Sequence, residues 1–185
     1  MEIGLISDTH SYLDPRVFKL FEDCDEVWHA GDFGQNVAEP LMEGFDQFRG
    51  VFGNIDDDEI KDQFPEDLRF DCQGVDVWMT HIAGKPGRYD RRVLAELKKN
   101  PPQVLICGHS HILHVEKDRR FDNMQYINPG AAGHHGFHLE RTLLKFTIAD
   151  GELSRIRLIE LGPRGRMPKR TVSYTHLTLP TILLV

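Results

Sequence analysis

The sequence is poor in cysteine. Its three cysteines, Cys24, Cys72 and Cys107, form no CxxC pair, and each lies in or beside an apolar run. An odd number of isolated thiols is typical of small buried side chains in a reducing compartment, and it argues against disulfides and against a cysteine metal cluster. The sequence therefore predicts a cytoplasmic protein.

The pattern of a leader peptide and a long hydrophobic run are also missing from the sequence, so we expect neither a signal peptide nor a membrane span. Met1 is followed at once by Glu2 and then by a short apolar run over residues 3–6, with no basic region before it. No stretch is long and apolar enough to span a bilayer. We expect no membrane association.

The sequence also has fewer basic than acidic residues. The 185 residues include 22 Lys and Arg against 29 Asp and Glu, and the formal net charge is -7. A protein that binds nucleic acid over a broad surface needs clustered Lys and Arg to contact the phosphates, so the excess of acidic residues argues against nucleic acid as a partner. It does not exclude a small phosphorylated substrate, because a bound metal can supply the local positive charge.

What the sequence does contain is an alternation of short apolar runs and helical periods. Strands are predicted over residues 3–6, 26–30, 48–52, 75–80, 104–107, 113–117, 124–128, 143–149 and 153–159. Helices are predicted after Asp14-Pro15, after a cap at Asn36, and over residues 90–99. The first half alternates strand and helix, and the second half is rich in strands. This order predicts an α/β fold of two stacked mixed β-sheets flanked by helices, a four-layer α/β/β/α sandwich.

The composition changes toward the carboxyl terminus. We predict a domain over residues 1–162, a basic segment rich in Gly and Pro over 163–171, and a tail over 172–185 that has no Asp, Glu, Lys or Arg. Residues 172–181 resemble one reading frame of a transposon-end adapter used in DNA library preparation, so we interpret the tail as non-native. A natural apolar strand is the alternative, which Pro180 disfavours.

Polar side chains follow five of the predicted strands at the points where they end. They are Asp8, Asp32, Asn54, His81 and His109. Ligands of open α/β sheets bind at this edge. Asp8 has a partner two residues on in His10, and His109 has one in His111. Since side chains at i and i+2 of an extended chain point the same way, each pair is expected to offer two ligands to one region.

This ordered set resembles the calcineurin-like metallophosphoesterase superfamily, and within it the small branch that contains bacterial phosphodiesterases and the retromer scaffold subunit. The likeness runs from Ile3 to about Leu161 and includes Asn128-Pro129-Gly130. It implies two metal ions. Their ligands would be Asp8, His10 and His111 at the first ion, Asn54, His81 and His109 at the second, and Asp32 between the two. It also implies catalytic roles for Asp32, Asn54 and His109.

The ligand chemistry fits this resemblance. Imidazole and carboxylate suit Mn first, with Zn, Fe, Ni or Co as alternatives, better than Ca or Mg. Two such ions about 3.5–4 Å apart would lower the pKa of a bridging water, whose hydroxide attacks the phosphoester. The predicted function is a metal-dependent phosphoesterase, either phosphodiesterase or phosphatase, acting on a phosphorylated small molecule.

A non-catalytic metal-binding scaffold for protein interactions is the alternative. Fold alone does not decide between the two, but a scaffold can lose ligands and here all seven positions are filled, which favours catalysis. A homo-oligomer is compatible with either interpretation.

One position departs from the family pattern. Many members have His directly after the Gly-Asn pair, where it can protonate the leaving group, whereas this chain has Ile55. Without that acid, on the order of 10²–10⁴ of rate would be missing for poor leaving groups, so we expect a preference for acidic leaving groups such as those of aryl phosphodiesters. For His134, His135 and His138 a solvated loop is the first interpretation, and a substrate contact at the cleft rim is the second.

Overall fold

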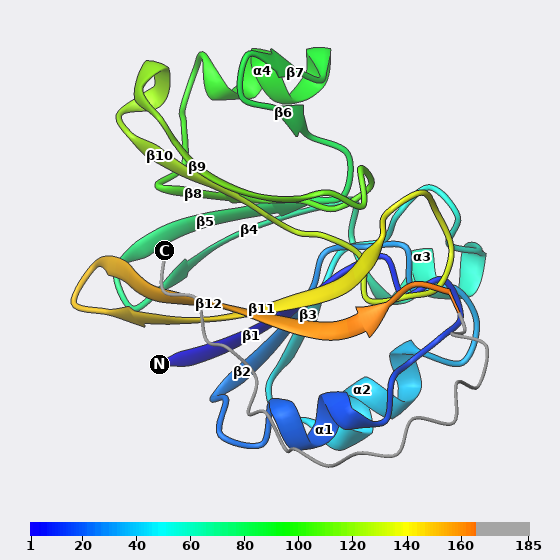
Figure 1. Cartoon of the computed structure of the whole chain (residues 1–185). Coiled ribbons are helices and arrows are strands. Elements are labelled where there is room, and N and C mark those ends of the chain that lie inside the picture. The colour runs from blue at the N-terminus through cyan, green and yellow to red at the C-terminus, as the bar shows by residue number, and fades with distance from the viewer. Residues whose placement is uncertain (166–185) are drawn as a thin grey trace.

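Two five-stranded β-sheets stack face to face in the computed structural model, which describes residues 1–165 (Figure 1). The first sheet has the order β12-β11-β1-β2-β3 and the second the order β4-β5-β8-β10-β9. The strands of the first sheet are β1 (Glu2–Ile6), β2 (Glu26–His29), β3 (Phe48–Gly50), β11 (Glu140–Ala149) and β12 (Glu152–Pro163). Those of the second are β4 (Asp67–Cys72), β5 (Val75–Thr80), β8 (Val104–Ile106), β9 (Leu113–Asp118) and β10 (Met124–Pro129).

The helices are short, and three of them, α1 (Arg16–Leu20), α2 (Ala38–Gly44) and α4 (Arg91–Leu97), lie on the outer faces of the sandwich (Figure 1). The others are α3 (Asp58–Gln63) and the 3-10 turn η1 (Arg119–Phe121). A small hairpin of β6 (Gly84–Lys85) and β7 (Arg88–Tyr89) precedes α4. In Figure 1, α1 and α2 cover the first sheet on one side and α4 covers the second sheet on the other. The predicted four-layer fold class is therefore confirmed.

Both sheets are mixed. Strands β1, β2 and β3 are parallel to one another, as are β5, β8 and β10. In the first sheet β11 pairs antiparallel with β1, and β12 pairs antiparallel with β11. In the second sheet the antiparallel strands β4 and β9 lie on either side of the parallel set. The carboxyl ends of the parallel strands in each sheet therefore meet at one edge, and the loops that follow them share it.

Alternating side chains fill the three interfaces between the layers. In β1, Ile3 and Leu5 face the core between the sheets, while Ile6 packs with the helices α1 and α2. In β5, Val77 faces the same central core, and Trp78 points to the layer of α4. This period of two is what a strand buried on both faces requires.

The sequence predictions differ from the structure at several elements. Strand β4 was not predicted, and the predicted cap of α2 is wrong, because Asn36 has a left-handed φ of 59° and α2 has no side-chain cap. The helix predicted over residues 90–99 is observed as α4, and Asp90 caps it, since its Oδ1 accepts from the Arg92 amide at 2.8 Å.

The predicted domain end at residue 162 stays a prediction, although β12 continues to Pro163. Most of the segment 163–171 and all of the tail 172–185 lie outside the described residues. Among the helices of residues 1–165, none combines the length and the apolar character that crossing a membrane requires.

Candidate metal centre

The five polar residues predicted at strand ends all follow the carboxyl ends of parallel strands. Asp8 follows β1, Asp32 follows β2 and Asn54 follows β3, while His81 follows β5 and His109 follows β8. Three of these strands belong to the first sheet and two to the second, so the ligands are gathered from both halves of the sandwich.

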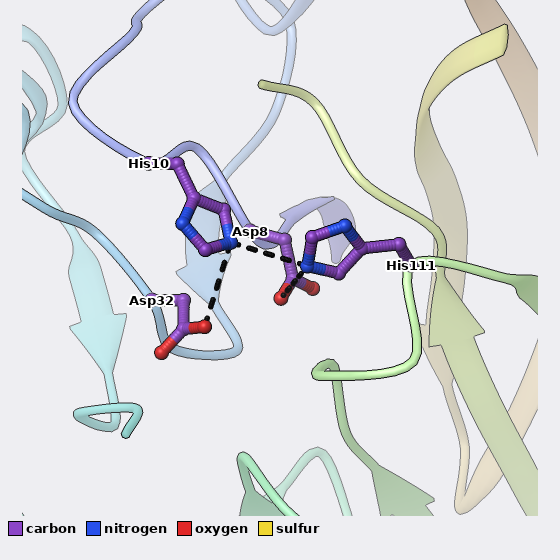
Figure 2. A group of neighbouring side chains, drawn as sticks. All are labelled: Asp8, His10, Asp32 and His111. Atoms are coloured by element: carbon purple, nitrogen blue, oxygen red, sulfur yellow. Dashed lines mark hydrogen bonds and ion pairs between the residues drawn. The ribbon is translucent and has the colours of Figure 1, made fainter. Parts of the chain in front are cut away.

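The first group of side chains consists of Asp8, His10, Asp32 and His111, each of which offers an atom within 4.8 Å of the others. Figure 2 shows the four side chains pointing toward one another from three loops. His10 Nε2 lies 3.1 Å from His111 Nε2 and 3.5 Å from Asp32 Oδ2. His111 Nε2 lies 3.2 Å from Asp8 Oδ1.

The second group consists of Asp32, His81 and His109, which meet the same 4.8 Å limit. His81 Nε2 lies 3.2 Å from Asp32 Oδ1, and Asn54 Oδ1 lies 2.7 Å from His109 Nδ1. The structure thus brings together all seven predicted side chains. Asp32 belongs to both groups, with its Oδ2 toward His10 and its Oδ1 toward His81.

The geometric reason for this convergence differs from the prediction. The pairs Asp8/His10 and His109/His111 are not extended. Their φ angles are 54° and 46° for the first pair and 67° and 58° for the second, and Asp32 has a φ of 59°. All five are left-handed, a region that Asp, Asn and His enter more readily than other non-glycine residues. Tight left-handed turns, not extended segments, aim these side chains inward.

Hydrogen bonds between the loops hold these turns in place. The Asp8 amide donates to the Gly31 carbonyl at 3.0 Å, and the His10 amide donates to the Asp32 carbonyl at 3.1 Å. The His109 amide donates to both carboxylate oxygens of Asp8 at 3.2 Å. Each loop is therefore fixed by its neighbours.

Two supporting residues escaped the sequence analysis. Ser7 is fully buried and donates its hydroxyl to Asp8 Oδ2 at 2.7 Å. Asp56 is buried and accepts from the amides of Gly34 at 2.8 Å and Gly53 at 2.7 Å, so it shapes the turn that carries Asn54. The sequence Gly-Asn-x-Asp could have predicted a structural role for Asp56 in the turn after Asn54. Nothing in the sequence distinguishes Ser7 from an ordinary loop serine.

The donor set fits a divalent metal. Asp8 and Asp32 are almost completely buried, and among the described residues their ion-pair partners are histidines, with no Lys or Arg. Buried carboxylates need a positive partner, and a metal ion supplies one. His81 Nδ1 donates to the Ala30 carbonyl at 2.7 Å, while its buried Nε2 has no hydrogen-bond partner in the described structure. A backbone-anchored imidazole with a bare inner nitrogen is the usual arrangement of a metal ligand.

The pKa values of the histidines agree with this reading. Burial lowers the pKa of His10 and of His109, which favours the neutral ring that binds a metal. Burial also acts to lower the pKa of His81, but the neighbouring carboxylates of Asp32 and Asp8 raise it overall. The hydrogen bond to Asp8 raises the pKa of His111. The negative charges of Asp8 and Asp32, which stabilise a proton on His81 and on His111, would also stabilise a metal cation among these side chains.

A model of the calcineurin-like phosphoesterase superfamily domain matches residues 1–151. The chain belongs to the calcineurin-like phosphoesterase superfamily. A Mycoplasma pneumoniae protein named "Probable metallophosphoesterase" is 33% identical over 139 residues, which cover 70% of this chain and 78% of the relative. A phosphodiesterase of Methanocaldococcus jannaschii is 27% identical over 150 residues, 70% of this chain and 83% of the relative.

Solved structures share the superfamily fold. An archaeal phosphodiesterase superposes with a TM-score of 0.69 at 24% identity, covering 87% of this chain and 100% of that chain. Wild-type Vps29 of Entamoeba histolytica in complex with zinc gives a TM-score of 0.66 at 21% identity, covering 87% of this chain and 93% of that chain. At these identities the two structures establish the fold alone, so the chemistry of this superfamily member has to be argued from its own residues.

Proposed function

We propose that this protein is a phosphoesterase, most fittingly a phosphodiesterase, that works with two divalent metal ions. The single observation that carries the proposal is the position of Asp32, whose two carboxylate oxygens face the two ligand groups. One carboxylate can bridge two cations in this way. The first ion would be held by Asp8, His10, Asp32 and His111, and the second by Asp32, Asn54, His81 and His109.

Bound divalent ions would neutralise the charge of a phosphoryl group and lower the pKa of a water. The chain's own residues provide the rest of the site. The Ile55 amide donates to Asp32 Oδ1 at 3.1 Å and keeps that oxygen turned toward His81. Asn54 uses its Oδ1 toward His109, which leaves its amide nitrogen as a donor for a phosphoryl oxygen. In hydrolysis a water oxygen bonds to phosphorus, and the ester oxygen leaves with the bonding electrons.

Among the described residues that line the pocket at the metal centre, the one carboxyl side chain is Asp32, which the proposal assigns to the metals and not to protonating the leaving group. The described residues that line it include Ile55 at the position where many relatives carry His. The preference for acidic leaving groups, such as aryl oxygens, therefore remains part of the proposal. Mn is the metal that we propose first, and the three free cysteines support a cytoplasmic location.

The test is hydrolysis of bis-p-nitrophenyl phosphate with added Mn, together with metal analysis of the purified protein. Asp32→Asn removes the negative charge that the two ligand groups share. The rate of hydrolysis should fall by more than about a hundredfold, because losing even a residue that only hydrogen-bonds to a metal ligand costs about 10–100-fold. Asp46→Asn makes the same change at an exposed site and should leave activity intact. Equal activity of Asp32→Asn and wild type would rule out the bridging role.

The scaffold alternative has its own outcome in the same experiment. Vps29, one of the structural neighbours, binds zinc in its solved complex. If the wild-type protein bound metal but showed no Mn-dependent hydrolysis on a panel of phosphoesters, a non-catalytic metal-binding role would replace the proposed one.

A further inference from the structure

Two exposed apolar side chains flank the metal centre. Ile55 is 44% exposed and Phe137 is 102% exposed, and both line the pocket that contains His10, Asp32 and His111. Single apolar side chains scattered over a surface need no explanation. Two of them at the mouth of one pocket, beside buried charged ligands, form a local apolar surface where a substrate would sit.

The loop that carries Phe137 is anchored on the metal centre. The Gly133 amide donates to the Asp8 carbonyl at 3.0 Å, and the His135 ring lies 4.8 Å from the His10 ring. Gly136 has a φ of 118° and passes so close to His111 that a Cβ at this position would lie 2.0 Å from its Nδ1. Phe137 follows directly after this contact, so the turn fixes its backbone at the rim of the pocket.

Among its described lining residues, the same pocket has no Lys or Arg that could pair with a second anionic group of a substrate. Ser110 also lines it; its Oγ accepts from Asn128 Nδ2 at 3.1 Å and from the Ile112 amide at 3.3 Å, so its hydroxyl can donate one neutral hydrogen bond but supplies no positive charge. A further phosphate or carboxylate on the substrate would therefore lack a cationic partner beyond the metal centre.

The size of the pocket points to a small substituent. Its volume is about 270 Å³, just below the roughly 300–1,000 Å³ of pockets that enclose drug-sized ligands. A phosphoryl group and one compact substituent would suit a space of this size, and an aromatic ring against Phe137 would add the preference of aromatic rings for one another.

We propose that Ile55 and Phe137 form a subsite for an uncharged apolar substituent of the phosphoester, with an aromatic ring as the best occupant. The inference rests on the proposed function, because that function places the phosphoryl group at the metal centre. It adds a contact of the substrate's organic part to the leaving-group chemistry already proposed for Ile55.

The first test measures binding without turnover. Phenylphosphonate and methylphosphonate carry the same phosphoryl group, and calorimetric titration of the Mn-loaded protein gives the ratio of their dissociation constants. Wild type should prefer the phenyl compound, and Phe137→Ala should reduce that preference about tenfold, since truncation removes most of the apolar surface available to the ring. Ile55→Ala should reduce it in the same direction.

The second test measures hydrolysis with a constant leaving group. Bis-p-nitrophenyl phosphate and methyl p-nitrophenyl phosphate release the same phenolate, so their ratio of kcat/KM reports the other substituent. Phe137→Ala should lower this ratio. Leu139→Ala is the matched control, because Leu139 is an 83% exposed apolar residue of the same loop that does not line the pocket. It should leave both ratios at their wild-type values.

The outcomes separate this inference from the proposed function. If the wild-type protein hydrolyses both esters and the ratios are the same in Phe137→Ala, the subsite is overturned while the phosphoesterase stands. If neither phosphonate binds and neither ester is hydrolysed with Mn, the proposed function fails and the subsite fails with it.

Discussion

Asn128 is the residue whose loss should damage the metal centre without removing any predicted ligand. Its side chain is fully buried at the end of β10. Nδ2 donates to the Gly108 carbonyl at 2.7 Å and to Ser110 Oγ at 3.1 Å, and Oδ1 accepts from the Gly130 amide at 2.9 Å. One amide therefore ties the turn at Gly130 to the segment 108–111, which carries His109 and His111.

The effect of Asn128→Ala follows from these bonds. The Gly108 carbonyl and the Gly130 amide would both remain buried without this partner, and each such group costs roughly 1–3 kcal/mol. We expect the free energy of unfolding to fall by about 2–5 kcal/mol. Because the segment 108–111 loses its anchor, the affinity for Mn should also fall about 10–100-fold, as when the supporting partners of metal ligands are lost.

The assay separates stability from positioning. Urea denaturation in the presence of a chelator gives the free energy of unfolding, and calorimetric titration gives the Mn affinity. Thr142→Val is the control: it removes one buried hydrogen bond, to the Pro129 carbonyl at 2.6 Å, from the same turn. It should cost about 1–2 kcal/mol and leave the Mn affinity unchanged. If Asn128→Ala destabilised the fold but bound Mn as tightly as Thr142→Val, the positioning argument would be wrong.

Two further substitutions test neighbouring parts of the reasoning. In Gly53→Ala the new Cβ would lie 2.0 Å from Asp32 Oδ1 and would displace that carboxylate. Because misplacing a catalytic group by about 1 Å costs about a hundredfold in rate, Mn-dependent hydrolysis should fall by about a hundredfold. Circular dichroism should show that the variant is still folded. The Arg120 hydrogen bond lowers the pKa of Asp118 to about 2. This hydrogen bond stabilises the folded state fully above the unfolded pKa of 3.8, and the stabilisation is lost as the pH falls toward 2. In urea denaturation at pH 7, Asp118→Asn should therefore lower the free energy of unfolding by about 1 kcal/mol. The difference between wild type and variant should become smaller as the pH falls from 4 to 2.

Much of the fold could be predicted from the sequence because its strands are short apolar runs with clear ends. The strand predicted over residues 75–80 is observed as Val75–Thr80. Strand β4 was missed because its alternation of Leu68, Phe70 and Cys72 with charged residues was weaker than a continuous run, and the strand is half-exposed at the sheet edge. Alternation of period two was the signal available for it.

The candidate site could be predicted for a different reason. Parallel strands deliver their carboxyl ends to one edge whatever their loops do, so the positions of Asp8, Asp32 and His109 in the chain were enough to place them. The loop conformations were not accessible in this way, because left-handed turns at non-glycine residues depend on tertiary hydrogen bonds. The same limit hid Ser7, whose importance lies in one contact with Asp8.

The left-handed turns of the metal centre are held by hydrogen bonds between loops. A non-glycine residue in this region costs on the order of 1–3 kcal/mol, less for Asp and His, and persists only where its surroundings over-determine it. Here the Asp8 amide is bonded to Gly31, the His10 amide to Asp32, and the His109 amide to the Asp8 carboxylate. These bonds join loops from both sheets and involve protein groups alone. The fold itself therefore sets the backbone geometry from which these side chains project.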